Sequence, residues 1–348
     1  MDNLENLSTL TTFTGSIDES WFYLTSVAIE ARGGPIVPLM LTAIASARVS
    51  DVATVKLCLR SFAERLDDLG SLLQQIHENC DPQIFYHRVR PFLAGSKNMT
   101  EAGLPNGVIY DDSTGVDVFR QYSGGSNAQS SLIQFFDIIL GIEHRPTGEK
   151  KNLASEIETA TRPKNSFIHE MRNYMPGPHR RFLDDVTKCA NIRSFVESHS
   201  NDSELSLAYD ACLAMLRAFR DKHINIVSRY IILKSRESRS RSRSPEILRR
   251  KQNIATASHQ DKAESGRKKL KGTGGTALLP FLKQARDETS EPAIDSWTKK
   301  IMNRGLDGTG KGDFFVGKFD EYTDGDLEVA GLAGTWTMES DGGGICHY

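Results

Sequence analysis

The feature that most constrains the fold is a run of eight apolar residues between positions 52 and 76, which recur in steps of three and four. Such a step is close to one helical turn, so all eight side chains fall on one face of a long helix. The run ends near residues 79–82, N-C-D-P, where a proline interrupts the pattern. Its members are Val52, Val55, Leu59, Phe62, Leu66, Leu69, Leu73 and Ile76. The segment therefore predicts a helix that buries one side in a core.

Helical periodicity continues over most of residues 17–233, and we expect an all-α fold. Residues 21–47 are predicted to be helical with a break at G-G-P, residues 33–35. A further helix is expected after Ser126, with loops over residues 101–128 and 144–165.

Residues 201–233 are the second strong helix, and Asn201 with Glu204 resembles a capping box at its start. Its apolar stripe consists of Leu205, Tyr209, Cys212, Leu216, Phe219, His223, Ile226 and Tyr230. One member of that stripe is therefore a histidine.

Composition excludes several classes of protein. The 43 Lys and Arg residues against 45 Asp and Glu give a net charge of −2, which argues against a polycation. No run of 18 uncharged apolar residues occurs, so no transmembrane helix is expected, and the acidic N-terminus does not resemble a secretory signal. The five cysteines are scattered without a C-x-x-C motif, which favours a reducing cytosol over a disulfide framework.

Residues 234–251 form a local basic run, with eight Lys and Arg against two Glu, a local charge of +6. Such a run could contact RNA or carry phosphorylation-controlled interactions. It has no aromatic residue for base stacking and lies inside the chain, so we do not expect nucleic-acid binding. Its low apolar content predicts a mobile loop instead.

Two buried polar residues are candidates for chemistry. His223 lies on an apolar stripe, either as a core histidine with satisfied nitrogens or as a metal or haem ligand. Asp137 lies in F-F-D-I-I-L and needs a cation or strong donors when buried. It is either part of a structural ion pair or an acid that orients a ligand histidine or pairs with Arg220.

Three weaker candidates accompany them. The Y-S-G-G-S-N-A-Q-S-S segment, residues 122–131, is either a turn with a helix cap or a loop that lets a ligand approach the backbone. The G-T-G-G-T segment, residues 272–276, is either a lid or a plain glycine-rich connection. Arg90 is either a surface arginine or a bidentate carboxylate clamp.

Four blocks in this order resemble the indoleamine 2,3-dioxygenase family, especially its fungal members. They are Y-S-G-G-S-N-A-Q-S-S-L-I-Q-F-F-D, M-R-N-Y-M-P-G-P-H-R-R-F-L, L-R-A-F-R-D-K-H-I-N-I-V-S-R-Y-I and K-G-T-G-G-T. The resemblance covers roughly residues 10–290. It implies an all-helical, cytoplasmic, monomeric protein that binds haem b. It also implies an enzyme that opens the indole 2,3-bond of L-tryptophan with O2, giving N-formyl-L-kynurenine for the kynurenine pathway.

The resemblance also implies roles for residues. His223 matches the proximal ligand of the haem iron, and Asp137 and Arg220 match the acid and arginine that support it. The other matches concern the substrate: Arg90 for its carboxylate, Phe85 and Trp21 as distal aromatics, Thr25 as a small distal residue, Gly125 and Ser126 beside a haem propionate and the substrate, and Thr273 for the ammonium group.

We expect five segments. They are a connection over residues 1–16, a helical haem domain over 17–233, a basic Arg/Ser-rich loop over 234–270, a mobile loop with a helix over 271–290, and a poorly ordered tail over 291–348. Family members carry a small helical domain before the segment that starts this chain, and its loss is expected to open the distal side. The alternatives are a non-catalytic haem-binding paralogue and a tryptophan dioxygenase of secondary metabolism.

Overall fold

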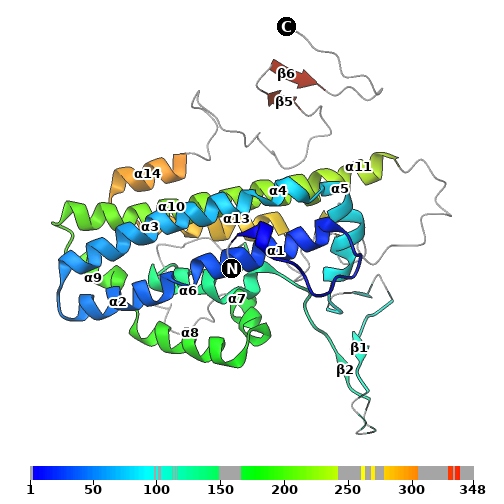
Figure 1. Cartoon of the computed structure of the whole chain (residues 1–348), viewed down its shortest axis with the longest axis horizontal. Helices are drawn as coiled ribbons and strands as arrows, with labels where there is room; N and C mark the ends of the chain where they lie inside the picture. The colour runs from blue at the N-terminus through cyan, green and yellow to red at the C-terminus, as the bar shows by residue number, and fades with distance from the viewer. Residues whose placement is uncertain are drawn as a thin grey trace. The chain divides into compact units, whose positions relative to one another are not determined.

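The computed structural model describes residues 3–97, 99–100, 103–111, 113, 115, 117–148, 166–241, 260–262, 268–270, 278–304, 328–331 and 334–337. Contacts divide the chain into two units, Met1–Lys299 and Lys300–Tyr348. The described part of the first unit is mainly helical with very few strand residues (Figure 1), so the predicted all-α fold is confirmed.

Two long helices, α3 (Val52–Gln74) and α10 (Ser203–Val227), lie along each other and form the core of the first unit (Figure 1). Seven of the eight apolar residues that predicted α3 are buried, while Val52 in the first turn is half-buried. The Phe62 ring packs 5.2 Å from the ring of Phe136, and the Cys212 thiol donates to the Leu59 carbonyl at 3.1 Å. The periodicity thus identified the core helix and its inward face.

The start of α10 differs from the prediction, because its N-cap is Asp202 and not Asn201. The Asp202 carboxylate accepts a hydrogen bond from the Leu205 N–H at 3.0 Å, which satisfies one of the free donors of the first turn. It also lies 2.7 Å from Lys56 Nζ of α3. An acid at this position therefore caps one helix and contacts its neighbour.

The other end of α10 continues as the π-helical segment η9 (Ser228–Leu233) and then as α11 (Lys234–Arg241). The first eight residues of the Arg/Ser-rich run are therefore helical, where a loop was expected from Lys234 onward. The rest of that run, residues 242–251, lies outside the described residues.

The predicted break at residues 33–35 is present, since α1 (Ile17–Gly33) ends there and α2 (Ile36–Arg48) begins. A Cβ on Gly33 would overlap the Leu132 side chain, so the glycine permits a close approach. By length and composition alone, Ile17–Arg48 is apolar enough to cross a membrane. Core helices of soluble proteins pass the same test, and Ala28, Ile36 and Met40 of this stretch are completely buried within the fold.

The remaining described helices are shorter. In chain order they are η1 (Leu4–Asn6), α4 (Ile76–Asn79), α5 (Pro82–Ile84), the π-helical η2 (Phe85–Val89), η3 (Arg90–Leu93), η5 (Asn127–Gln129), α6 (Ser131–Ile139), α7 (Ser166–Met171), η8 (Arg172–Tyr174), α8 (Gly177–Cys189), α9 (Ile192–Ser198), α13 (Leu278–Glu288) and α14 (Ser296–Arg304).

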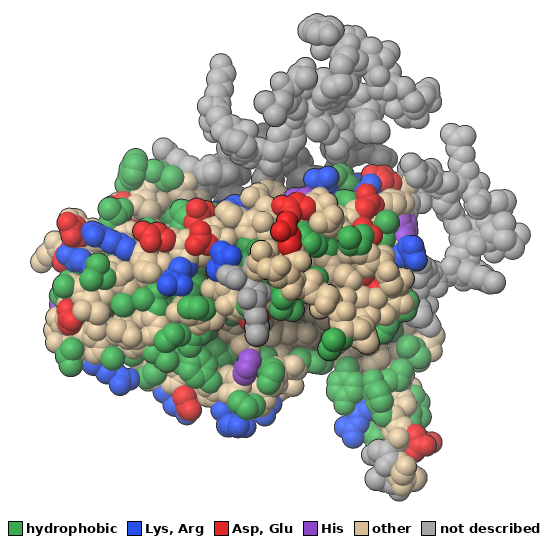
Figure 2. All heavy atoms as spheres, in the orientation of Figure 1, with side chains coloured by type: hydrophobic (Ala, Val, Ile, Leu, Met, Phe, Trp, Pro, Cys, Tyr) green, Lys and Arg blue, Asp and Glu red, His purple; other side chains and the backbone are tan. Residues whose placement is uncertain are grey.

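The described strands form three antiparallel pairs: β1 (Val108–Ile109) with β2 (Phe119–Arg120), β3 (Gln260–Lys262) with β4 (Lys268–Leu270), and β5 (Glu328–Gly331) with β6 (Gly334–Thr337). The first pair places Val108 opposite Arg120 in the segment predicted to be loops and turns. Figure 2 shows hydrophobic side chains on this hairpin and interspersed acidic and basic side chains elsewhere on the same face; Tyr110 and Phe119 of the hairpin are more than half exposed.

Candidate functional site

The apolar stripe of α10 is buried at both ends and more accessible between them. Its first four members, from Leu205 to Leu216, are completely buried, and Ile226 and Tyr230 are buried again further along. All six residues from Ala218 to His223 are only half-buried. His223 therefore lies in a half-buried stretch of the helix, between two stretches whose inward residues are buried.

The His223 side chain faces the loop that precedes α6. Its Nε2 atom lies 3.3 Å from Nδ2 of Asn127. Burial, aided by the positive charge of Arg220, lowers the pKa of His223 to about 4. The imidazole is consequently neutral at neutral pH, which is the form that binds metals through a ring nitrogen.

Asp137 and Arg220 form a buried ion pair one helical turn from His223. Nη2 of Arg220, on α10, donates to Oδ1 and Oδ2 of Asp137, on α6, at 2.6 and 2.8 Å. The Arg220 side chain is 12% exposed and that of Asp137 9%, so solvent screens the pair only weakly. A carboxylate among apolar residues needs a cation nearby, and for Asp137 this cation is Arg220. The predicted pairing of Asp137 with Arg220 is therefore present in the structure.

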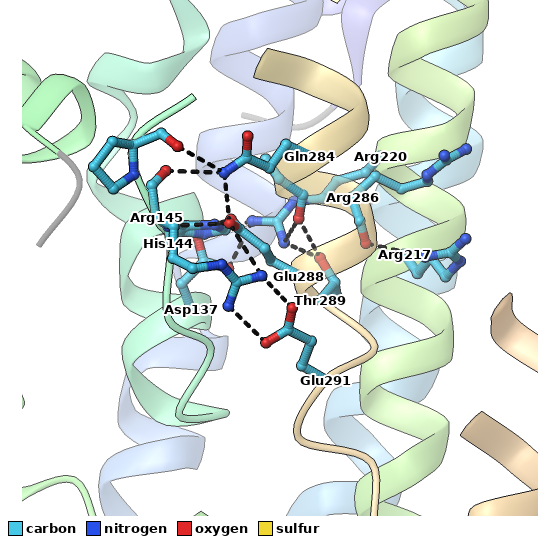
Figure 3. Close-up of polar contacts among 12 residues, drawn as sticks. Asp137, His144, Arg145, Arg217, Arg220, Gln284, Arg286, Glu288, Thr289 and Glu291 are labelled. Atoms are coloured by element: carbon cyan, nitrogen blue, oxygen red, sulfur yellow. Dashed lines mark hydrogen bonds and ion pairs between the residues drawn. The ribbon is translucent and has the colours of Figure 1, made fainter. Parts of the chain in front are cut away.

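A second partner of Asp137, His144, was not anticipated from the sequence. His144 lies just beyond α6, and its ring is held between Asp137 and Glu288 of α13 (Figure 3). Nε2 is 3.0 Å from Oδ2 of Asp137, and Nδ1 is 2.7 Å from Oε2 of Glu288. No local pattern marks a loop histidine of this kind, because both of its partners come from other elements.

The pKa values of this cluster shift in the directions expected of an ion pair. Burial alone would raise the pKa of Asp137, but Arg220 and His144 outweigh it and hold that pKa below its ordinary value. Burial alone would lower the pKa of His144, but Asp137 and Glu288 outweigh it and raise that pKa. Each shift favours the charged form of its group.

The end of α13 carries further contacts of the cluster (Figure 3). Oε1 of Glu288 accepts from the Arg145 N–H at 3.0 Å and from Nε2 of Gln284 at 2.9 Å. Arg145 also makes a bidentate pair with Glu291. Arg217 of α10 donates to the Arg286 carbonyl at 3.1 Å. These bonds attach α13 both to α10 and to the segment after α6.

The glycine- and serine-rich loop before α6 is fixed by its backbone. The Gly125 N–H donates to the Leu93 carbonyl at 3.0 Å, and a Cβ on Gly124 would overlap that same carbonyl oxygen. Ser126 forms a capping box with Gln129 at the start of η5. The helix cap predicted for this segment is therefore present, while the approach of a ligand to its backbone stays a prediction.

Arg90 is completely buried, so it is not the surface residue that the sequence favoured by default. Its guanidinium carbon lies 5.6 Å from the centre of the Tyr86 ring, within cation–π range. Burial lowers the pKa of Arg90 to about 10, so the side chain keeps its charge at neutral pH.

Phe85, five residues earlier at the start of η2, joins an aromatic cluster. Its ring lies 4.9 Å from that of Phe22 and 5.7 Å from that of Tyr230. Tyr230 belongs to η9, which continues the helix of His223, so two π-helical segments of the described residues, η2 and η9, meet here. π-Helical turns occur frequently at functional sites.

The structure places the two α1 candidates as follows. Nε1 of Trp21 donates to the Gln75 carbonyl at 2.7 Å, which directs the indole toward the end of α3. The Thr25 hydroxyl is buried and donates to the Trp21 carbonyl at 2.8 Å. Phe22, which the sequence did not single out, is the α1 aromatic that contacts Phe85. Thr273 lies outside the described residues.

The donors present fit one type of metal site better than another. Among the described residues, no three His, Cys, Asp or Glu side chains gather to hold a bare metal ion. In a haem, four porphyrin nitrogens already bind the iron, so the protein needs to supply only one axial ligand, commonly a histidine. A single neutral, half-buried imidazole on the stripe of α10 matches that requirement.

Comparison with known proteins agrees with this chemistry. Residues 1–292 match the family model described as indoleamine 2,3-dioxygenase. Indoleamine 2,3-dioxygenase of Saccharomyces cerevisiae is 40% identical over 289 residues, covering 82% of this chain and 62% of the relative. Indoleamine 2,3-dioxygenase qulI of Penicillium citrinum is 40% identical over 290 residues, covering 82% and 57%.

A third relative is named for a different substrate. The 6-hydroxytryptophan 2,3-dioxygenase fscD of Fusarium equiseti is 37% identical over 291 residues, covering 83% of this chain and 64% of the relative. The chain thus spans about three fifths of the length of the curated relatives it matches.

Proposed function

Since the chain belongs to the indoleamine 2,3-dioxygenase family, we propose that it binds haem b through His223 and cleaves the indole 2,3-bond of L-tryptophan with O2, giving N-formyl-L-kynurenine. The observation that carries the proposal is the neutral, accessible imidazole of His223, one helical turn from the buried Arg220–Asp137 pair. A relative named for this activity, in Saccharomyces cerevisiae, supports the substrate class.

Haem, when bound, supplies the iron and the chemistry of O2, and the protein supplies binding and orientation. Arg90 holds a buried positive charge and is assigned to the substrate carboxylate, which a guanidinium binds in a bidentate manner. Phe85 offers an aromatic surface to the indole, and Gly125 and Ser126 offer the backbone and hydroxyl of a fixed loop. Thr273 is assigned to the ammonium group.

No residue is assigned as a catalytic base. The Thr25 hydroxyl donates within its own helix, and the Trp21 N–H is engaged by a backbone carbonyl. Neither group therefore offers a free basic atom to the substrate. In this proposal Trp21 and Thr25 contribute to the shape of the distal wall and do not transfer protons.

The direct test is the absorption spectrum of the haem-reconstituted full chain, ferric and then reduced under CO, with and without L-tryptophan, followed by a formylkynurenine assay. We expect a histidine-ligated spectrum that responds to tryptophan, and turnover. His223→Ala is expected to abolish that spectrum while leaving the far-UV circular dichroism unchanged, because the side chain is only half-buried and alanine is a good helix former. His199→Gln, at the C-cap of α9, is the matched control.

Each outcome decides between named alternatives. A haem spectrum without turnover identifies a non-catalytic haem-binding protein. A full haem spectrum in His223→Ala contradicts the ligand assignment, and no stoichiometric haem in the wild type contradicts the proposal as a whole.

A ring-substituted substrate is the second candidate, because the Fusarium equiseti relative is named for 6-hydroxytryptophan. Under this alternative the chain serves secondary metabolism instead of the kynurenine pathway. Competition between L-tryptophan and 6-hydroxytryptophan in one assay, quantified by mass spectrometry, gives the ratio of the two kcat/KM values directly.

We place the protein in the cytosol as a monomer. The cysteines of the described residues, Cys58, Cys80, Cys189 and Cys212, are all free thiols, which suits a reducing compartment. Fluorescence microscopy of a tagged full chain and light scattering of the purified protein test these two assignments.

A further inference from the structure

The imidazole of His144 lies between two carboxylates that can only accept hydrogen bonds. Nε2 faces Asp137 at 3.0 Å, and Nδ1 faces Glu288 at 2.7 Å. A neutral imidazole has one N–H and one lone pair, so it would direct that lone pair at a carboxylate oxygen in one of the two contacts. An imidazolium donates in both. With both carboxylates ionised, the geometry thus requires a second proton on this ring.

The charges of the innermost groups lead to the same result. Asp137, Glu288, Arg220 and His144 have side chains between 2% and 12% exposed. Two negative carboxylates and one guanidinium leave a net charge of −1, and an imidazolium brings this to zero. An unbalanced charge at this depth costs several kcal/mol.

The groups around this inner set pair among themselves. Arg145 pairs with Glu291 and lies 3.6 Å from Glu288. Arg286 lies 3.0 Å from Asp221 and 2.9 Å from Asp287, and Arg217 lies 3.4 Å from Asp287. The Glu143 carboxylate next in sequence is exposed. The described outer groups therefore give the inner carboxylates one near cation, Arg145, which a second acid already engages.

We propose that Glu288 and His144 are positioning residues of the candidate haem site: Glu288 acts through a doubly protonated His144 to hold Asp137 against Arg220, one turn from His223. The proposal rests on the proposed function for its link to haem, while the protonation of His144 stands on hydrogen-bond geometry and charge balance. Three elements meet in it, because Asp137 belongs to α6, Arg220 to α10 and Glu288 to α13.

The direction of the resulting pH dependence follows from linkage. The pKa of His144 is raised above its ordinary value of 6.5 in the folded protein. Its contribution to stability is then fully present below pH 6.5 and is lost as the pH rises through the folded pKa. In that window the unfolding equilibrium constant is expected to increase by up to about tenfold per pH unit, since one proton leaves on unfolding.

Glu288→Gln tests the mechanism without removing the contact. A neutral His144 can donate from Nε2 to Asp137 and accept at Nδ1 from the amide of the new glutamine, so the second proton is no longer needed. Urea unfolding of the full chain between pH 6 and 9 is expected to lose stability with pH in the wild type and to show a clearly shallower slope in Glu288→Gln. Glu64→Gln, at an exposed position of α3, should keep the wild-type slope.

A second readout concerns haem itself. The rate of haem transfer from the reconstituted protein to an excess of apomyoglobin should rise several-fold from pH 6.5 to pH 9 in the wild type, and should be nearly constant in Glu288→Gln. Wild-type protein with no alkaline loss of stability, or Glu288→Gln with the full wild-type slope, overturns the protonation of His144.

The two proposals fail in different ways. If the unfolding slopes differ as expected but haem transfer shows no pH dependence, His144 only stabilises the fold and the positioning role is overturned. If no variant binds haem, the proposed function fails, and the unfolding slopes still decide the protonation of His144.

Discussion

The two halves of α10 differ in the side chains that they direct at the rest of the fold: apolar in the first half, mainly charged or polar in the second. From Leu205 to Leu216 its inward face is apolar and completely buried against α3. From Arg217 to His223 the same helix carries two arginines in buried polar contacts and an accessible histidine. The first half holds the fold together through packing, and the second half presents fixed charges and a ligand atom.

The difference shows that each half is specified by different parts of the chain. Packing in the first half depends on regularly spaced residues of two helices. The charges of the second half are balanced by side chains from α6, from the segment after it, and from α13. A site of this kind is therefore sensitive to changes far away in the sequence, while the packed half is sensitive mainly to changes in its own two helices.

The largest effect is expected from breaking the packed half. Phe62→Ala removes a completely buried ring that contacts Phe136 and should lower the free energy of unfolding by about 3–5 kcal/mol. Leu57→Ala, at a position of α3 that is 65% exposed, should change it by less than about 0.5 kcal/mol. Urea unfolding followed by circular dichroism measures both, and equal losses in the two variants would contradict the assigned inward face.

The next largest effect is expected from the charged half. Arg220→Ala leaves Asp137 buried with His144 as its remaining cation, and should cost about 3 kcal/mol. Lys222 on the same helix lies 3.8 Å from an exposed carboxylate of Asp67, so Lys222→Ala should cost less than about 1 kcal/mol. The same unfolding experiment applies, and a loss below 1 kcal/mol for Arg220→Ala would show that the pair is not the stabilising contact of this half.

The smallest effect is expected at the first residue of the packed half, where α10 begins. Asp202→Ala removes the N-cap of α10 and its contact with Lys56, and about 1 kcal/mol of stability should be lost. Asn201→Ala should leave the stability unchanged, because the Asn201 side chain is exposed and does not cap the helix. The reverse order in thermal unfolding would restore Asn201 as the capping residue.

Periodicity predicted the fold well because it reports on packing that repeats along a helix. The stripes of α3 and α10 and the break at Gly33 are all present in the structure. The predicted cap of α10 lies one residue early, because Asn and Asp are both good caps and neighbouring candidates look alike in the sequence; Asp202 also lies 2.7 Å from Lys56 of another helix.

The candidate site was only partly predictable for the same reason. Asp137 demanded a cation from its apolar neighbours alone, and Arg220 lay one turn from His223 on the same helix. His144 and Glu288 carry no such local signal, because each is explained only by the other and by Asp137. The roles of Arg90, Phe85 and the α1 residues toward a substrate rest on the family resemblance and stay predictions.

The long-range contacts of α13 also determine the order in which the contacts of the charged cluster can form during protein synthesis. Asp137 and Arg220 are 83 residues apart, whereas His144 and Glu288 are 144 apart. A chain emerging from the ribosome can therefore bring Asp137 and Arg220 together while Glu288 has not yet been translated. Until then His144 has a single acidic neighbour and no need of its second proton. Glu288 is the last of the four inner residues to be translated, and its carboxylate is the second partner of His144. A nascent chain can therefore form the whole cluster only after α13 has been translated.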